Sequence, residues 1–180
     1  MSEKNDDVFQ SAQGQMRLSE RLLAEIPGFR GYKQKELRRE SDKLIRNDLS
    51  MKLTAARTSF KTVFQRMSDN RQLDVLTDMD RLGAKFDRVI ERVSHASYGY
   101  TGFFDVVKIQ EAALDRMTNF DNQLVDQVNT IATQVDAFKT DVSKQNFSNA
   151  KDRVQNLTDA VETLDDTLSK REEVIMGVVS

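Results

Sequence analysis

Apolar residues recur at alternating intervals of three and four along most of this chain of 180 residues. The spacing is most regular in the C-terminal half, where two series keep it for about three heptads each: Leu124, Val128, Ile131, Val135, Phe138 and Val142, and then Phe147, Ala150, Val154, Leu157, Val161, Leu164 and Leu168. Such a stripe is typical of a helix that buries one face against other helices. The pattern predicts long helices packed as a bundle or a coiled coil.

The N-terminal half carries the same signal in two further series. No proline or glycine occurs from Lys33 to Met67, which favours one long helix over that range. A second helix is expected from about Leu73 to about His95. The stripe residues of these two helices are Ala56, Phe60, Val63 and Met67, followed by Leu73, Leu76, Met79, Leu82, Phe86, Val89 and Val93.

Four short segments interrupt the helical pattern. Pro27 and Gly28 break it near the start, and a segment with two glycines and four aromatics, 98–104, breaks it in the middle, with Asp105 as the expected N-cap of the next helix. The polar runs 68–70 and 143–146 are short enough to make their flanking helices antiparallel neighbours. We therefore expect one all-α domain, 1–180, with a short leading helix at about 6–25 and hairpins at about 33–95 and 105–178.

The composition favours a particular cellular compartment and argues against a membrane-spanning protein. Cysteine is absent, which excludes disulfides and thiol chemistry and fits a reducing compartment. No stretch approaches the roughly 20 apolar residues of a membrane-spanning helix, and residues 1–13 carry too many charges for a signal peptide. We expect a cytoplasmic protein, with peripheral membrane association as an open alternative.

The inventory of catalytic side chains is small. The single histidine, His95, follows Glu91 by four residues, whereas a ferritin-like metal site needs two Glu-x-x-His pairs. No glycine-rich phosphate loop is present. We expect no enzyme activity, no metal, no cofactor and no small-molecule substrate, and we interpret His95 as a residue at a helix end.

The charge is distributed unevenly along the chain. Residues 30–66 hold eleven basic and four acidic residues, a net charge of +7, whereas residues 111–180 hold seven basic and thirteen acidic residues, a net charge of −6. Part of the basic stretch falls within an arc of about 80° on one helix face and can bind an anionic surface by counterion release. The candidate residues for this basic face are Lys33, Lys35, Arg38, Arg39, Lys43 and Arg46.

Two other interpretations of the basic face stay open. Acidic residues three or four positions away, such as Asp42 before Arg46, predict an ordinary self-paired helix surface. Alternatively, the basic residues pair with acidic residues of the C-terminal hairpin of the same chain.

Aromatic residues supply a second set of candidate interface positions. Phe29 and Tyr32 adjoin the basic face and favour insertion at a membrane surface. The aromatics of the middle break can contact a partner or can plug the end of the bundle. They are Tyr98, Tyr100, Phe103 and Phe104.

The segment from Ile26 to Lys43, together with Tyr98 to Asp105, resembles an uncharacterised family of prokaryotic helical proteins with a Pro-Gly-x-x-Gly-Tyr-x-x-Lys-Glu-x-Arg-Arg-Glu-x-Asp-Lys stretch. The resemblance covers about 26 residues and implies a prokaryotic source, with no activity attached. In architecture and charge polarity alone, the hairpins are similar to membrane-remodelling helical hairpin proteins of the phage-shock type.

These observations favour a non-enzymatic helical scaffold or adaptor. It would bind a protein partner, itself or an anionic membrane through coiled-coil seams and the basic face. The alternative is an accessory protein that binds nucleic acid with the same face. An intramolecular bundle and an association between chains would both bury the apolar stripes.

Overall fold

A computed structural model describes residues 19–31, 35–95 and 111–176 of the chain, and its regular structure in these ranges is entirely helical. The long helices are α2 (Lys35–Asp69), α3 (Leu76–His95), α5 (Glu111–Ser143) and α6 (Ala150–Met176), with a short 3-10 helix η1 (Leu73–Val75) before α3. The all-α prediction is confirmed. The predicted starts of the first and fourth helices, near 6 and 105, lie outside the described residues.

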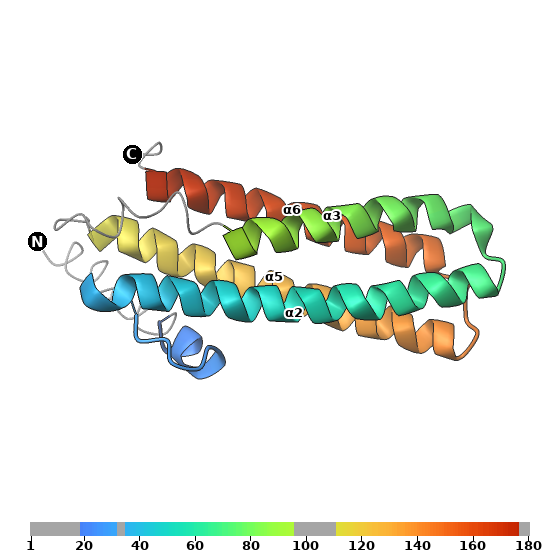
Figure 1. The fold of residues 1–180 in the computed structure, drawn as a ribbon, viewed down its shortest axis with the longest axis horizontal. Helices are drawn as coiled ribbons and strands as arrows, with labels where there is room; N and C mark the ends of the chain where they lie inside the picture. The colour runs from blue at the N-terminus through green and yellow to red at the C-terminus, as the bar shows by residue number, and fades with distance from the viewer. Residues whose placement is uncertain (1–18, 32–34, 96–110, 177–180) are drawn as a thin grey trace, which may run out of the picture.

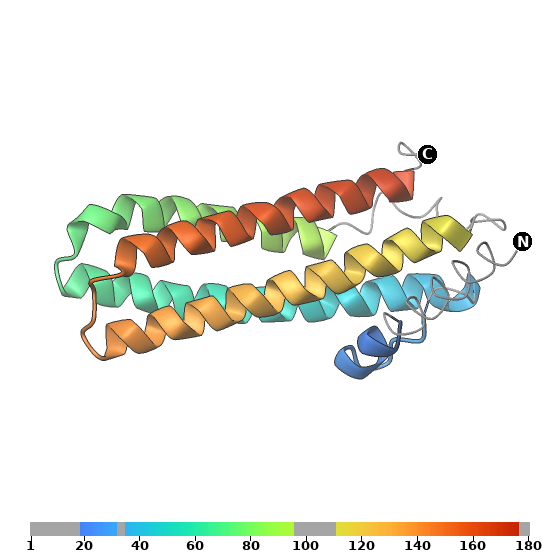
Figure 2. The same cartoon turned by 180° about the vertical axis from the view of Figure 1, so that it is seen from behind.

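The four long helices form a bundle of two hairpins lying side by side (Figure 1). Both α2 and α6 pack against α3 and against α5. The turns α2–α3 and α5–α6 lie at the same end, so α2 runs parallel to α5 and α3 runs parallel to α6 (Figures 1 and 2). We call this the turn end, and we call the opposite end, where α2 and α5 begin and α6 finishes, the open end. The shorter α3 finishes before it reaches the open end (Figure 1).

Both hairpin turns have the same backbone geometry. Arg71 and Gln145 adopt left-handed φ values of 57° each. After α2 the amide of Gln72 donates to the carbonyl of Met67 over 3.0 Å, and after α5 the amide of Asn146 donates to that of Asp141 over 3.0 Å. This is the Schellman arrangement, which pairs the last carbonyls of a helix and turns the chain back sharply. The polar runs that predicted these turns lie where the turns occur.

The core is built from the predicted stripes. Every stripe residue predicted for α5 and every one from Ala150 onward in α6 is buried, as are Ala56, Phe60, Val63 and Met67 of α2. Leu73 lies in the turn before α3 and is 66% exposed, and Val75 is buried instead. Two other stripe residues, Leu76 and Phe147, are only partly buried. The stripes are thus buried within one chain, which accounts for the heptads without a second copy.

A short helix at residues 19–25 precedes the bundle and is the described part of the predicted leading helix. Figures 1 and 2 show it outside the four long helices, beside the beginning of α2. Pro27 and Gly28 follow it as predicted, and Gly28 has a φ of +84° that other residues rarely adopt. Among the described residues, no helix is long and apolar enough to cross a membrane.

Candidate functional site

A buried ionic cluster occupies the core at the open end. Arg171 of α6 is 3% exposed, and its Nη2 donates to Oδ1 of Asp42 in α2 over 2.7 Å. The Nε of the same arginine donates to Oδ1 of Asp121 in α5, also over 2.7 Å. The second oxygen of Asp42 accepts from Nε of Arg46 at 2.8 Å. We call these four residues the ionic layer, which joins three helices that are far apart in sequence.

The heptad pattern explains why these charges are buried. Asp121 lies three residues before Leu124, Arg171 lies three residues after Leu168, and Asp42 lies three residues before the buried Ile45. Each charged residue therefore continues its helix's apolar stripe by one step and points into the core. The sequence contained this signal, but our predicted stripes began at Ala56 in α2 and at Leu124 in α5 and ended at Leu168 in α6, so they missed the layer.

The layer contains two carboxylates and two guanidinium groups, so its formal charges cancel. Side-chain exposure is 4% for Arg171, 3% for Asp42 and 0% for Asp121, and both Asp121 and Arg171 make further polar interactions. Charges removed from water to this degree are tolerated only when they are paired and hydrogen-bonded. The arrangement is suited to holding three helices in register, because each group has a fixed partner.

The remaining buried polar residues gather at the same end. Seven of the described residues are both buried and polar or charged: Ser41, Asp42, Thr118, Asp121, Asn122, Thr167 and Arg171. They lie near the start of α2, in the first part of α5 and toward the end of α6. Several bond to backbone, as when Thr118 donates to the carbonyl of Leu114 over 3.0 Å. Thr167 donates to the carbonyl of Thr163 over 2.9 Å and also accepts from the Gln127 side chain at 2.9 Å. The described core is thus apolar toward the turn end and mixes apolar with polar residues toward the open end.

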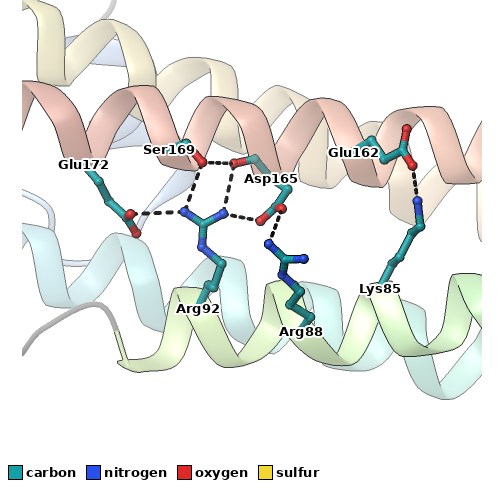
Figure 3. Close-up of polar contacts among 7 residues, drawn as sticks. All are labelled: Lys85, Arg88, Arg92, Glu162, Asp165, Ser169 and Glu172. Atoms are coloured by element: carbon teal, nitrogen blue, oxygen red, sulfur yellow. Dashed lines mark hydrogen bonds and ion pairs between the residues drawn. The ribbon is translucent and has the colours of Figure 1, made fainter.

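A second polar network joins α3 to α6 on the surface (Figure 3). Arg92 bonds to Asp165 and Ser169, and its Nη2 lies 3.1 Å from Oε2 of Glu172. Partial burial lowers the pKa of Arg92, but its bond to Asp165 and the charge of Glu172 outweigh this and raise the pKa above the ordinary value. Lys85 pairs with Glu162 further along the seam. Three acidic residues of α6, Glu162, Asp165 and Glu172, therefore pair with basic residues of α3.

The predicted basic face is divided by the structure. Arg39 and Lys43 are exposed on α2. Arg46 is different, because its side chain is only 12% exposed and is bound to Asp42 in the ionic layer. The self-pairing of Asp42 with Arg46, four residues apart, is therefore present. Lys33 lies outside the described residues, and the side chains of Lys35 and Arg38 are likewise outside the description.

Of the predicted interface aromatics, the structure describes only Phe29. Phe29 is 3% exposed and belongs to the hydrophobic core, so the exposed position that we expected for it is wrong. The turn at Pro27 and Gly28 directs it inward with Leu22 and Ile26. The other candidates, Tyr32, Tyr98, Tyr100, Phe103 and Phe104, lie outside the described residues.

His95 lies at the last residue of α3, with Nδ1 3.1 Å from the carbonyl oxygen of Glu91 and 4.0 Å from its carboxylate. Both side chains are well exposed. Among the described residues, no group of three or more histidines and carboxylates is placed to hold a metal ion. The geometry fits the interpretation of His95 as a helix-end residue.

Comparisons with protein-family models, with curated proteins and with solved structures find no match to this chain. The resemblance of the segment from Ile26 to Lys43 to an uncharacterised family stays a prediction. The function is therefore argued from the geometry of the open end.

Proposed function

We propose that this protein is a non-enzymatic helical scaffold that binds an acidic surface of a protein partner at its open end. The observation that supports this proposal most strongly is that the buried polar and charged residues of the described core gather at that end, among buried apolar residues such as Met117 and Ile175. Exposed cations of α2, Arg39 and Lys43, lie at the same end as the buried ionic layer.

The energetics of buried ion pairs support a role other than stability. Replacing a buried charge network by apolar residues of similar size is often neutral or stabilising, because pairing only offsets the cost of removing charges from water. A chain that places Asp42, Asp121 and Arg171 in stripe positions therefore gains little stability from these charges. Buried polar groups of this kind fix the register and partner choice of helices, and binding regions are drawn from the less stable parts of a fold.

The exposed charge indicates the kind of partner. Arg39 and Lys43 lie four residues apart on α2 and can meet carboxylates of another protein, with Lys33, Lys35 and Arg38 extending the basic stretch in sequence. Complementary charge of this kind steers association and increases its rate.

A protein surface is favoured over a membrane because the apolar contribution to membrane insertion is reduced. Phe29 is buried, and the large apolar side chains that are well exposed in the described part are dispersed along the chain: Leu23, Met51, Leu73 and Met176. Isolated exposed apolar residues are normal on a protein surface and do not form an insertion patch.

The state of the buried carboxylates supports a non-enzymatic role. Asp42 and Asp121 are both bound to the guanidinium group of Arg171, so neither is placed as a free general acid or base. General acid–base catalysis needs a group that can exchange a proton with a substrate.

The proposal is tested by quantitative capture from an extract of the native host. The variant Arg39→Glu with Lys43→Glu reverses two exposed charges at the open end, and the matched control Lys61→Glu with Lys151→Glu reverses two exposed charges nearer the turn end. We expect a protein that is captured by wild type and by the control and lost from the first variant. Capture that is equal on all three proteins contradicts the proposal.

Two further arms of the experiment separate the alternatives. Co-sedimentation with anionic and neutral vesicles tests the membrane, and a mobility shift at low salt tests nucleic acid. Charge-dependent binding in either arm, without protein capture, assigns the basic face to that surface instead and contradicts the proposal.

A further inference from the structure

A pocket of about 280 Å³ opens on the surface between α5 and α6. Its α5 wall is formed by residues three and four positions apart, which share one helix face: Arg116, Asn119, Phe120 and Gln123. Its α6 wall is formed in the same way by Lys170, Glu173 and Val174. These residues lie near the beginning of α5 and near the end of α6, so the pocket belongs to the open end (Figure 2).

Two of the lining residues are apolar. Val174 is 7% exposed, and Phe120 is partly buried and packs against the hydrophobic core. A ring and a valine that line the same pocket can contact an apolar group, because the contact removes apolar surface from water on both sides. The pocket can therefore hold an apolar side chain.

The polar residues of the pocket form no side-chain hydrogen bond or ion pair within the described part of the chain. They are Arg116, Asn119, Gln123, Lys170 and Glu173. The Nε of Arg116 is also buried, and no described acceptor bonds to it. A buried donor without an acceptor is costly, and a carboxylate is an acceptor that a guanidinium group binds in a fixed, charge-assisted geometry. The pocket thus contains an arginine that lacks the partner its chemistry requires.

The charge of the pocket favours an acidic occupant. Arg116 and Lys170 contribute two positive charges and Glu173 contributes one negative charge, so the formal net charge of the lining is +1. On the seam between α3 and α6, by contrast, the basic residues Lys85 and Arg92 are paired with carboxylates of the same chain. Unpaired cations beside an apolar surface are complementary to a carboxylate that has an apolar neighbour.

Two features favour side chains of a protein over a small molecule as the occupant. Asn119 and Gln123 are exposed and lie four residues apart on α5, and their amides can both donate to and accept from peptide groups. The volume of about 280 Å³ is also smaller than the roughly 300–1,000 Å³ that is typical of small-molecule sites.

We propose that the pocket between α5 and α6 receives an acidic side chain of the protein partner, together with the apolar side chain next to it. The carboxylate pairs with Arg116 and Lys170, and the apolar side chain packs on Phe120 and Val174. Arginine and aromatic residues are enriched among the residues that dominate binding at protein interfaces. This inference rests on the proposed function, since it requires a partner with an acidic surface, and it adds the site that anchors this surface.

The test uses the full-length protein and short peptides followed by two-dimensional NMR. The probe is the peptide acetyl-Gly-Asp-Phe-Asp-Gly-amide. One matched peptide replaces both aspartates by asparagine, and another replaces the phenylalanine by glycine. The Nε–H resonance of Arg116, assigned from its loss in Arg116→Gln, reports directly on the pocket.

A pair of variants shows whether the two cations of the pocket are responsible. Arg116→Gln with Lys170→Gln removes both of them. The matched control Lys61→Gln with Lys144→Gln removes two exposed cations near the turn end.

We expect the acidic peptide to shift the Nε–H resonance of Arg116 and the amides of residues 116–123 and 170–174. Its affinity should fall about tenfold in the Arg116 and Lys170 variant, which corresponds to the loss of one charge-assisted hydrogen bond, and should be unchanged in the control. The asparagine and glycine peptides should both bind more weakly. An unchanged spectrum, shifts outside these residues, or equal affinity of either matched peptide overturns the inference.

Two further measurements identify the occupant. Phenylacetate carries a carboxylate and a ring on a small molecule, and tighter binding of phenylacetate than of the peptide assigns the pocket to a small ligand and overturns the inference. A protein captured through Arg39 and Lys43 should displace the peptide from the pocket. A captured protein that leaves the peptide bound overturns the inference while the proposed function stands. The peptide titration does not depend on capture, so failure of the proposed function is distinguishable from failure of this inference.

Discussion

Arg171 of α6 reaches across the open end of the bundle to Asp42 of α2, with Nη2 2.7 Å from Oδ1. The two residues are 129 positions apart in the sequence. Their helices belong to different hairpins, α2–α3 and α5–α6. The pair therefore joins the hairpins directly through the core.

Arg171→Met should be strongly destabilising. The substitution leaves the carboxylates of Asp42 and Asp121 buried without their shared guanidinium, which typically costs about 3–5 kcal/mol. The free energy of unfolding in urea measures the loss. Arg153→Met is the control, because Arg153 pairs with Asp141 at the surface and should cost about 1 kcal/mol or less. A loss no larger than that of the control would show that the layer is not a paired charge network.

Removing the three charges of the layer that lie in stripe positions should have the opposite outcome. The triple variant Asp42→Leu, Asp121→Leu and Arg171→Met leaves no buried charge without a partner in the stripe positions. Arg46, at 12% side-chain exposure, can extend its guanidinium toward water. We expect stability between that of wild type and about 4 kcal/mol above it. A triple variant as unstable as Arg171→Met would mean that the layer itself stabilises the fold.

The surface seam between α3 and α6 should depend unequally on its two arginines (Figure 3). Arg92 is 23% exposed and contacts three residues of α6, so Arg92→Met should cost about 1–2 kcal/mol, between the values for exposed and buried pairs. Arg88 is 71% exposed and its loss should cost less than about 0.5 kcal/mol. Equal effects of the two substitutions in urea unfolding would contradict the assigned geometry.

The contribution of Arg92 should not change as the pH is raised through the neutral range. Its pKa in the folded protein is raised, so the stability that it contributes is fully present below the unfolded value and is lost only as the pH passes above the folded value. The ordinary pKa of arginine already lies far above the neutral range, and the folded value is raised further. The difference in unfolding free energy between wild type and Arg92→Met should therefore be constant from about pH 7 to pH 10. A difference that falls over this window would contradict the assignment.

Glycine at the two hairpin turns should stabilise the bundle. Arg71 and Gln145 hold a left-handed conformation that costs side chains roughly 1 kcal/mol and costs glycine nothing. Gln145→Gly and Arg71→Gly should each raise the unfolding free energy by up to about 1 kcal/mol, reduced by the greater freedom of glycine in the unfolded chain. Lys144→Gly, at the preceding non-left-handed position, is the control and should destabilise. A loss of stability at both left-handed positions would contradict the turn assignment.

The sequence predicted the helices and turns because their signals are local. Stripes such as Leu124 to Val142 and polar runs such as 143–146 depend only on spacing and on short-range backbone preferences. The position of Phe29 could not be predicted in this way, because its burial depends on packing against residues that are distant in the sequence. The same holds for the pairing of Arg92 with Asp165, since periodicity does not specify which helices become neighbours.

The ionic layer could be predicted from the sequence in part. The register that buries Asp121 and Arg171 was present in their stripes, and extending each stripe by one heptad step would have placed both in the core. Their identity argued against burial, because Asp and Arg are almost never fully buried unless they are paired. The pairing that resolves this conflict comes from helices about 50 and 129 residues apart in sequence.

Hydrogen exchange of the wild-type protein with and without its captured partner tests the central claim most directly. The account predicts slower exchange in the complex at the open end, around residues 39–46 and the first third of α5, with no change around the turns near Arg71 and Gln145. Protection confined to the turn end, or spread evenly over the four helices, would contradict the claim that the open end is the binding end.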